Sequence, residues 1–256
     1  MMNRRKTLKE IDAEIKDMSP AEALKHLEQL RTEGISSVNK LIEKYEKLLQ
    51  AGEKEARRLE EMSKYERDAA LQGFRLVAGI DEAGRGPLAG PVVAACVILP
   101  EGSMIPGLND SKKLSAAQRE KLYDLIIEKA VSIGIGFADE KLIDEINILN
   151  ATKAAMIEAI DKVKPRPDLL LIDAVRLEEA DIPQLPIIKG DALSISIAAA
   201  SIIAKVTRDR LIEEADAVYP VYGFKKHKGY GTEEHIKAIK KYGICPIHRI
   251  SFTRNI

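Results

Sequence analysis

The sequence predicts an α/β protein, a mixed β-sheet flanked by helices, with a helical N-terminal extension and a helical C-terminal segment. Beyond residue 73, short apolar runs alternate with segments of helical periodicity, which is typical of layered α/β folds. The first 70 residues differ in composition, because 30 of them are charged against 50 of the remaining 186. We therefore expect a charged extension over residues 1–70, a core over residues 71–216 and a basic segment packed on that core over residues 217–256.

Two helices are expected in the extension. Ser19-Pro20 is typical of an N-cap followed by the first helical residue, and leucines then recur on one helix face. From residue 36 to about residue 65, apolar residues recur at three- and four-residue spacing with Glu and Lys between them. Because 15 basic and 15 acidic residues balance in this extension, a solvated helical hairpin is favoured over a direct grip on phosphates.

The core elements follow in order. The apolar runs predict strands at residues 76–80, 92–99, 131–137, 169–172 and 186–188. The helical patterns cover residues 116–130, 141–163 and 194–219. Ser115-x-x-Gln118 is a capping box that marks the start of the first of these helices. The second helix is expected to break near residues 147–150.

Composition excludes several classes of protein. Lys and Arg number 40, as do Asp and Glu, so bulk charge gives no argument for nucleic-acid binding. Cys96 and Cys245 lie far apart and form no C-x-x-C pair, which disfavours a disulfide framework or a structural zinc site. The longest nearly uncharged stretch, residues 88–100, is too short to span a bilayer. We expect a soluble cytoplasmic protein that does not bind membranes.

Four acidic residues stand where strand-like apolar runs end. They are Asp81 and Glu82 after residues 77–80, Asp173 after residues 169–172, and Asp191 after residues 187–190. Clustered carboxylates raise one another's pKa unless a cation neutralises them, and oxygen ligands favour Mg²⁺ or Mn²⁺. A single Asp in such a position is more often a helix N-cap, but three coincidences in one chain favour a metal site. Two ions there would suit in-line displacement at phosphorus.

A glycine-rich turn follows the first acid pair. Its sequence from Gly84 to Gly90 matches neither the dinucleotide-binding motif nor the P-loop. A tight hairpin turn is the simplest interpretation. The alternative is that Gly84 and Gly86, on either side of Arg85, allow backbone N–H groups to approach a sugar or a phosphate.

The last 38 residues carry a local charge of +6, with eight Lys or Arg against two Glu. Aromatic residues are interleaved with these charges: Tyr222, Phe224, Tyr230 and Tyr242. This pattern suits a nucleic-acid surface, where phosphate contacts give affinity and a ring can stack on a base or sugar. A solvated tail is the alternative. The histidines of this segment have no metal-binding spacing.

Five strings together resemble bacterial ribonuclease HII. They are GIDEAGRGP (79–87), DSKKLS (110–115), KGD (189–191), IAAASIIAKVTRD (197–209) and KGYGT (228–232). The resemblance runs in order over about residues 74–252. It implies a ribonuclease H-like fold and hydrolysis of the RNA strand of RNA–DNA hybrids. It also implies nicking 5′ of a single ribonucleotide in duplex DNA, with 3′-hydroxyl and 5′-phosphate ends. We expect a monomer whose partners are RNA–DNA hybrid and ribonucleotide-containing duplex DNA.

The resemblance also implies roles for individual residues. The metal ligands of that family fall on Asp81, Glu82, Asp173 and Asp191, the set that the strand-end argument selects. The loop that recognises the ribose 2′-hydroxyl falls on Gly84, Arg85 and Gly86, and the tyrosine that packs against the following sugar falls on Tyr230. Ser111 and Lys112 resemble its phosphate-contacting loop. A 2′-hydroxyl is the group that distinguishes RNA from DNA at such a site.

Other interpretations stay open at this point. Many compact members of the family lack the 70-residue extension, so the resemblance says nothing of its role. Ribonuclease HIII usually has a β-containing N-terminal domain and Glu as its fourth acid, whereas this chain has a helical pattern and Asp191. The remaining alternatives are a non-catalytic module that binds hybrids or duplexes and another two-metal nuclease, such as a junction resolvase. A resolvase would leave the glycine-rich loop and Tyr230 unexplained.

Overall fold

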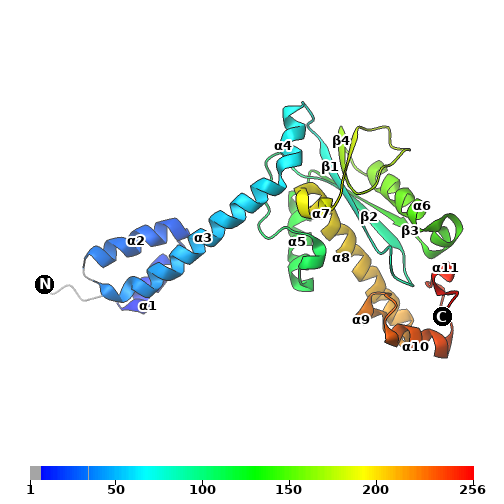
Figure 1. Ribbon diagram of the computed structural model, residues 1–256. Coiled ribbons are helices and arrows are strands. Elements are labelled where there is room, and N and C mark those ends of the chain that lie inside the picture. The colour runs from blue at the N-terminus through cyan, green and yellow to red at the C-terminus, as the bar shows by residue number, and fades with distance from the viewer. Residues whose placement is uncertain (1–6, 34) are drawn as a thin grey trace. The chain divides into compact units, whose positions relative to one another are not determined.

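The computed structural model describes residues 7–33 and 35–256, and the chain forms two compact units, Met1–Arg58 and Leu59–Ile256. The first unit contains α1 (Leu8–Ile15), α2 (Pro20–Thr32), the short η1 (Ser36–Val38) and most of α3 (Asn39–Met62) (Figure 1). Its apolar cluster includes Ile11, Ile15, Leu27, Val38 and Ile42. The helices of the extension therefore pack on one another through a small apolar core of their own.

The helix α1 is an element that the sequence interpretation missed. Thr7 caps it, and Glu10 bonds back to the Thr7 backbone N–H at 2.7 Å. This capping box, followed by Ile11 and Ile15 four residues apart, is a signal that was available in the sequence.

The second expected helix of the extension, over residues 36 to about 65, corresponds to η1 and α3, and a further helix follows it. The helix α3 ends at Met62, and α4 (Lys64–Leu71) follows after a single residue, Ser63. The Ser63 hydroxyl donates to the carbonyl of Leu59 at 2.8 Å, a back-bond that bends helices. The second unit starts at Leu59, so α4 belongs to it.

The second unit is built on a five-stranded mixed sheet with strand order β3-β2-β1-β4-β5. The strands are β1 (Val77–Ala83), β2 (Val92–Ile98), β3 (Ser132–Ala138), β4 (Leu169–Asp173) and β5 (Gln184–Ile187). The first three form an antiparallel meander, whereas β4 runs parallel to β1 and β5 runs parallel to β4. The predicted α/β class and all five predicted strands are confirmed.

Helices cover both faces of this sheet (Figure 1). One face packs on α6 (Glu140–Asp161), and the other packs on α5 (Ala116–Lys129) and α8 (Ile195–Val218). A Cβ added at Gly134 or Gly136 would lie 1.9 Å from a carbonyl oxygen of α6, so these glycines permit the close approach of that helix. The predicted break in α6 is confirmed at Asn147, whose φ is 69°.

Close packing also brings the N-terminus of α8 against the central strand. A Cβ at Gly79 would lie 2.0 Å from the backbone of Ser196, so only glycine fits there. Directly before α8 stands the four-residue helix α7 (Gly190–Leu193), which carries Asp191. Because Gly79 has no side chain, the start of α8 packs closely on β1. This places α7 beside the carboxyl ends of β1 and β4.

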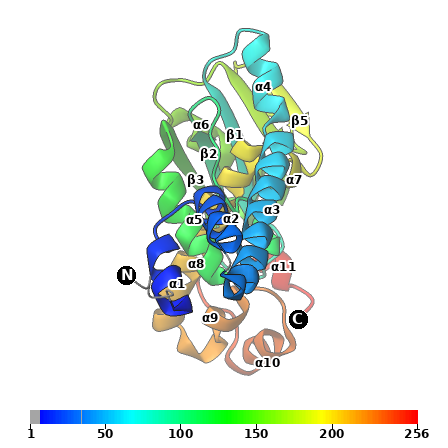
Figure 2. The same cartoon turned by 90° about the vertical axis from the view of Figure 1, so that its left-hand side faces the viewer.

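The C-terminal segment forms short helices at one end of the second unit (Figure 2). These are η3 (Pro220–Tyr222), α9 (Phe224–His227), α10 (Glu233–Tyr242) and α11 (Ile250–Thr253). A bridge between Ala89 and His248 joins the segment to the glycine-rich turn. Among the described residues, no helix is long and apolar enough to cross a membrane.

Candidate active site

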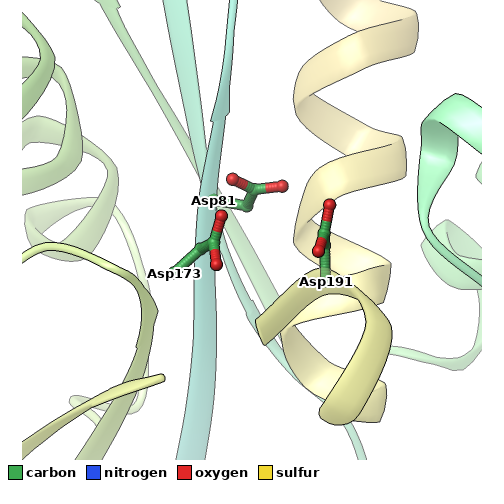
Figure 3. A group of neighbouring side chains, drawn as sticks. All are labelled: Asp81, Asp173 and Asp191. Carbon is green, nitrogen blue, oxygen red and sulfur yellow. The ribbon is translucent and has the colours of Figure 1, made fainter. Parts of the chain in front are cut away.

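Three of the four predicted acids converge at the carboxyl ends of β1 and β4. The parallel register pairs Ile80 with Ile172, so Asp81 and Asp173 follow at equivalent positions of neighbouring strands. Asp191 faces them from α7 (Figure 3). One carboxylate oxygen from each of the three lies within 4.8 Å of the others.

A backbone hydrogen bond holds Asp173 in place, and an ion pair holds Asp191. Asp173 accepts a hydrogen bond from the backbone N–H of Gly190 at 2.8 Å, which ties the end of β4 to the start of α7. A Cβ at Gly190 would lie 2.5 Å from Ile197, so the tie needs glycine. Asp191 forms an ion pair with Lys112 at 3.1 Å.

Burial makes the ionised forms of these acids costly. Asp81 is 4% exposed, and burial followed by the charge of Glu82 raises its pKa well above the ordinary range. Burial and then the charge of Asp191 raise the pKa of Asp173, although the Gly190 N–H opposes this. A bound divalent cation stabilises the ionised forms of buried carboxylates that otherwise repel one another.

Glu82 lies outside the group of three. It follows Asp81 directly in β1, and its charge interacts with those of Asp81 and Asp173. Its Oε1 accepts a hydrogen bond from the Arg85 guanidinium at 3.3 Å, and its Oε2 is buried without a hydrogen-bond partner among the described residues. Burial raises its pKa, and the charge of Asp173 adds to that rise while Arg85 opposes it.

The residues therefore fit a divalent cation. They supply hard oxygen donors, raised pKa values at Asp81, Glu82 and Asp173, and a buried Glu82 oxygen that no described residue pairs with. Figure 3 shows the three aspartates pointing into one space. Whether Glu82 joins them as a ligand stays a prediction.

The loop that carries Ser111 and Lys112 lies beside this group. Ser111 is 4% exposed and its hydroxyl lies 2.8 Å from that of Ser201 on α8, which in turn hydrogen-bonds Asp81. Burial opposes the rise in the pKa of Lys112, but its hydrogen bond to Asp191 and that carboxylate's charge outweigh it. The phosphate-contacting role stays a prediction. Ser201 was not predicted as a site residue, although it lies in the string 197–209 that resembles the family.

The glycine-rich turn approaches Tyr230 from a distant part of the chain. Gly84 has a φ of +97°, and a Cβ there would lie 2.1 Å from the Arg208 side chain. A Cβ on Gly86 would lie 3.7 Å from the Tyr230 ring. Arg85 and Gly86 are exposed, and Tyr230 is 47% exposed. The turn and the tyrosine thus form one surface.

Half of the predicted aromatic surface is buried instead. Tyr222 and Phe224 are 6% and 0% exposed and stack on each other at 5.3 Å between ring centroids, so neither can stack on a base. Three histidines complete this cluster: His227, His235 and His248. Burial lowers the pKa of His235 to about 4. The expectation of an aromatic nucleic-acid surface is wrong for Tyr222 and Phe224.

Comparison with known proteins places this architecture. The family model described as ribonuclease HII matches residues 78–255, and the model of the ribonuclease HII N-terminal domain matches residues 7–70. The chain belongs to the ribonuclease HII family. A ribonuclease HII from Acetivibrio thermocellus is 60% identical over 249 residues, 97% of each chain. The ribonuclease HII of Clostridioides difficile is 51% identical over 251 residues, 98% of each chain.

Solved structures of ribonuclease HII relatives share the fold. The ribonuclease H2 of Pyrococcus horikoshii superposes with a TM-score of 0.59 at 30% identity, covering 70% of this chain and 95% of its own. The predicted ribonuclease H-like fold, the family and the assignment to endonucleases are thereby confirmed. The N-terminal family model ends at residue 70, whereas the compact units divide after Arg58. The three-part functional division of the chain stays a prediction.

Proposed function

We propose that this chain hydrolyses the RNA strand of RNA–DNA hybrids and nicks 5′ of single ribonucleotides in duplex DNA. The observation that carries the proposal is the group of Asp81, Asp173 and Asp191, with ligand atoms within 4.8 Å of one another at the rim of the sheet. Family membership supports the hybrid as substrate class. The products of the proposed reaction carry 3′-hydroxyl and 5′-phosphate ends.

In this proposal the three aspartates hold the divalent cations together with Glu82. Two Mg²⁺ or Mn²⁺ ions would activate water and stabilise the charge that develops on phosphate oxygens during in-line displacement. The Lys112 side chain pairs with Asp191 and is 75% exposed, so it can contact the phosphate of the substrate. Ser111 is buried and supports that loop through Ser201.

Recognition of the ribonucleotide is assigned to the exposed turn and Tyr230. The donors in this assignment are the backbone N–H groups of Arg85 and Gly86, which are exposed residues, and a Cβ on Gly86 would lie 3.7 Å from the Tyr230 ring. A 2′-hydroxyl can accept a hydrogen bond from such a donor, whereas deoxyribose offers no acceptor at that position. The basic C-terminal segment supplies sequence-independent phosphate contacts.

The test is cleavage of labelled duplex DNA containing one ribonucleotide, with Mg²⁺ or with EDTA. An all-DNA duplex and the Asp81→Asn variant serve as controls. We expect one metal-dependent nick 5′ of the ribonucleotide, absent from the all-DNA duplex and reduced at least about a thousandfold in the variant.

Two results would contradict the proposal. Full activity in Asp81→Asn would remove the carboxylate group from the mechanism. Binding without any cleavage by the wild-type chain would point instead to a non-catalytic module that binds hybrids.

A further inference from the structure

Two buried arginines, Arg249 and Arg208, contact the glycine-rich turn from the interior of the protein. Arg249 donates to the carbonyl oxygens of Gly84, Arg85, Pro87 and Gly90. Arg208 on α8 donates to the carbonyl oxygens of Ala89, Pro91 and Lys228, each at 3.0 Å. Every hydrogen bond of the two guanidinium groups among the described residues goes to a main-chain carbonyl.

Burial of these two side chains is close to complete. Arg249 is 0% and Arg208 is 1% exposed. Burial and then the charge of Arg208 lower the pKa of Arg249 to about 10, so its guanidinium is still charged at neutral pH. Charged groups without a hydrogen-bonded carboxylate are costly to bury, and the carbonyl oxygens of the turn supply the compensation here.

Peptide geometry links these contacts to the exposed face of the turn. In a planar trans peptide, the C=O of one residue and the N–H of the next point in opposite directions. Arg249 holds the carbonyls of Gly84 and Arg85 inward, which turns the N–H groups of Arg85 and Gly86 outward. Neither N–H is donated to an acceptor in the described part of the chain, and both residues are exposed.

The charge also acts on the strength of those donors. A cation that bonds to a carbonyl polarises its peptide group, and this strengthens the hydrogen bond that the N–H on the other side can donate. Arg208 supports the same turn from α8, because a Cβ on Gly84 would lie 2.1 Å from its Nε. The turn is therefore pre-organised with two donors toward solvent.

We propose that Arg249, assisted by Arg208, is a positioning residue that orients the Arg85 and Gly86 amides toward the ribose 2′-hydroxyl and so sets selectivity for a ribonucleotide. This inference rests on the proposed function of the turn. Neither arginine touches substrate; each acts through the backbone that it holds. In the sequence Arg249 stands among the basic residues of the C-terminal segment, and no local pattern indicates this role.

The alternative is a purely structural latch, in which Arg249 only fastens the C-terminal segment to the core. The test compares Arg249→Lys with Arg254→Lys, a matched change at an exposed arginine five residues away. For each protein we would measure the KM for a duplex with one ribonucleotide. The Ki of the all-DNA duplex as a competitor would be measured under the same conditions.

Positioning and structural roles give different results in this assay. Lys has a single compact donor group and cannot replace the planar fork of Arg249, so we expect KM to rise and Ki/KM to fall at least about tenfold, with Ki unchanged. A latch that is merely weakened lowers the active fraction and hence Vmax, but leaves Ki/KM as in the wild type. Arg254→Lys should match the wild type.

Further outcomes are decisive as well. An unchanged Ki/KM in Arg249→Lys overturns the inference while leaving the proposed function intact. If that variant does not fold, Arg208→Lys, which keeps Arg249, should lower Ki/KM in the same direction, and an unchanged ratio there overturns the inference. A wild-type chain that fails to nick the ribonucleotide duplex contradicts the proposed function itself.

Discussion

Burial of the Asp81 carboxyl group disfavours its ionised form. Its pKa is raised by burial and by Glu82, so at a pH between the ordinary and the raised pKa the folded state holds a proton that the unfolded state has released. The stability from this group is present below the ordinary Asp pKa of about 4 and is lost as pH rises through the folded-state value. At neutral pH without metal, Asp81 therefore destabilises the fold.

Asp81→Asn should accordingly raise the melting temperature in EDTA at pH 8, because a neutral amide removes the repulsion. The gain should shrink as pH falls toward 4, where the wild-type carboxyl is protonated. Mg²⁺ should stabilise the wild type by about 2.7 kcal/mol at one hundred times its Kd, and stabilise the variant much less. Thermal unfolding across pH, with and without metal, measures both effects.

A variant less stable than the wild type in EDTA at every pH would contradict this prediction. It would show that Asp81 is held by favourable hydrogen bonds rather than opposed by its neighbours. Asp68→Asn, at an exposed position of α4, is the control for the chemical change alone, and it should not alter the response to Mg²⁺.

Tyr230 offers a second prediction at this scale. Its ring lies beside Gly86, so Tyr230→Ala should weaken selectivity for the ribonucleotide while the metal response is retained. For comparison, loss of an aromatic ring that stacks on a nucleic-acid base costs about 1–3 kcal/mol. Tyr242→Ala, an equally exposed tyrosine of the same segment, is the control. Equal Ki/KM values in the two variants would remove Tyr230 from recognition.

The helix α4 is the element whose position was hardest to predict. Its Glu66 accepts hydrogen bonds from the Ser194 hydroxyl at 2.6 Å and the Ser196 N–H at 2.9 Å, at the N-terminus of α8. A carboxylate there satisfies an N–H group that the helix itself leaves unpaired. One residue of the charged extension therefore caps the helix that follows Asp191.

Glu66→Ala should lower the free energy of unfolding by about 1–2 kcal/mol, the usual cost of losing a helix cap. Glu66→Gln keeps an acceptor oxygen and should lose less. Chemical denaturation of the full chain measures both, with Asp68→Asn on the same helix as a control. Equal stability of Glu66→Ala and the control would show that the cap contributes nothing.

Elements with strong local signals were predictable, and elements that depend on tertiary contacts were not. The five strands follow from apolar runs, and the Ser115 capping box is present as expected. The helix α7 has four residues and is held by the Asp173 contact to Gly190, which no local pattern reveals. The three aspartates were identified from strand ends alone.

Side-chain burial was the part that pattern could not decide. Tyr222 and Tyr230 both stand among basic residues, yet the first is buried and the second is exposed. Their difference arises from packing of Tyr222 against Phe224 and the histidines, which are brought together only by the fold. Likewise, nothing local distinguishes Arg249 from the exposed Arg254.

At the scale of the whole molecule, the boundary between compact units makes a prediction about truncation. Leu59 and Met62, at the end of α3, are 2% and 4% exposed within the core of the second unit. Removal of residues 1–58 should leave a folded, active nuclease. Removal of residues 1–70 also removes Leu59, Met62 and the Glu66 cap, and should cost about 3 kcal/mol or more.

Thermal unfolding and cleavage of the single-ribonucleotide duplex, measured for both truncated chains, test this directly. Equal melting temperatures would show that residues 59–70 add nothing to the second unit. Loss of activity on removing residues 1–58 alone would give the first unit a part in the reaction.

The attachment of the glycine-rich turn also fixes the order in which the site is completed. Arg249 donates hydrogen bonds to four carbonyls of this turn, and the first of them precedes it by 165 residues. During synthesis Asp81, Asp173 and Asp191 emerge first, and the turn lacks the hydrogen bonds of Arg249 until that residue has left the ribosome. Closing so long a loop is slow and entropically costly. In the proposed mechanism, the nascent chain therefore acquires its carboxylates before the turn that is assigned to recognition of the ribose 2′-hydroxyl is held in place.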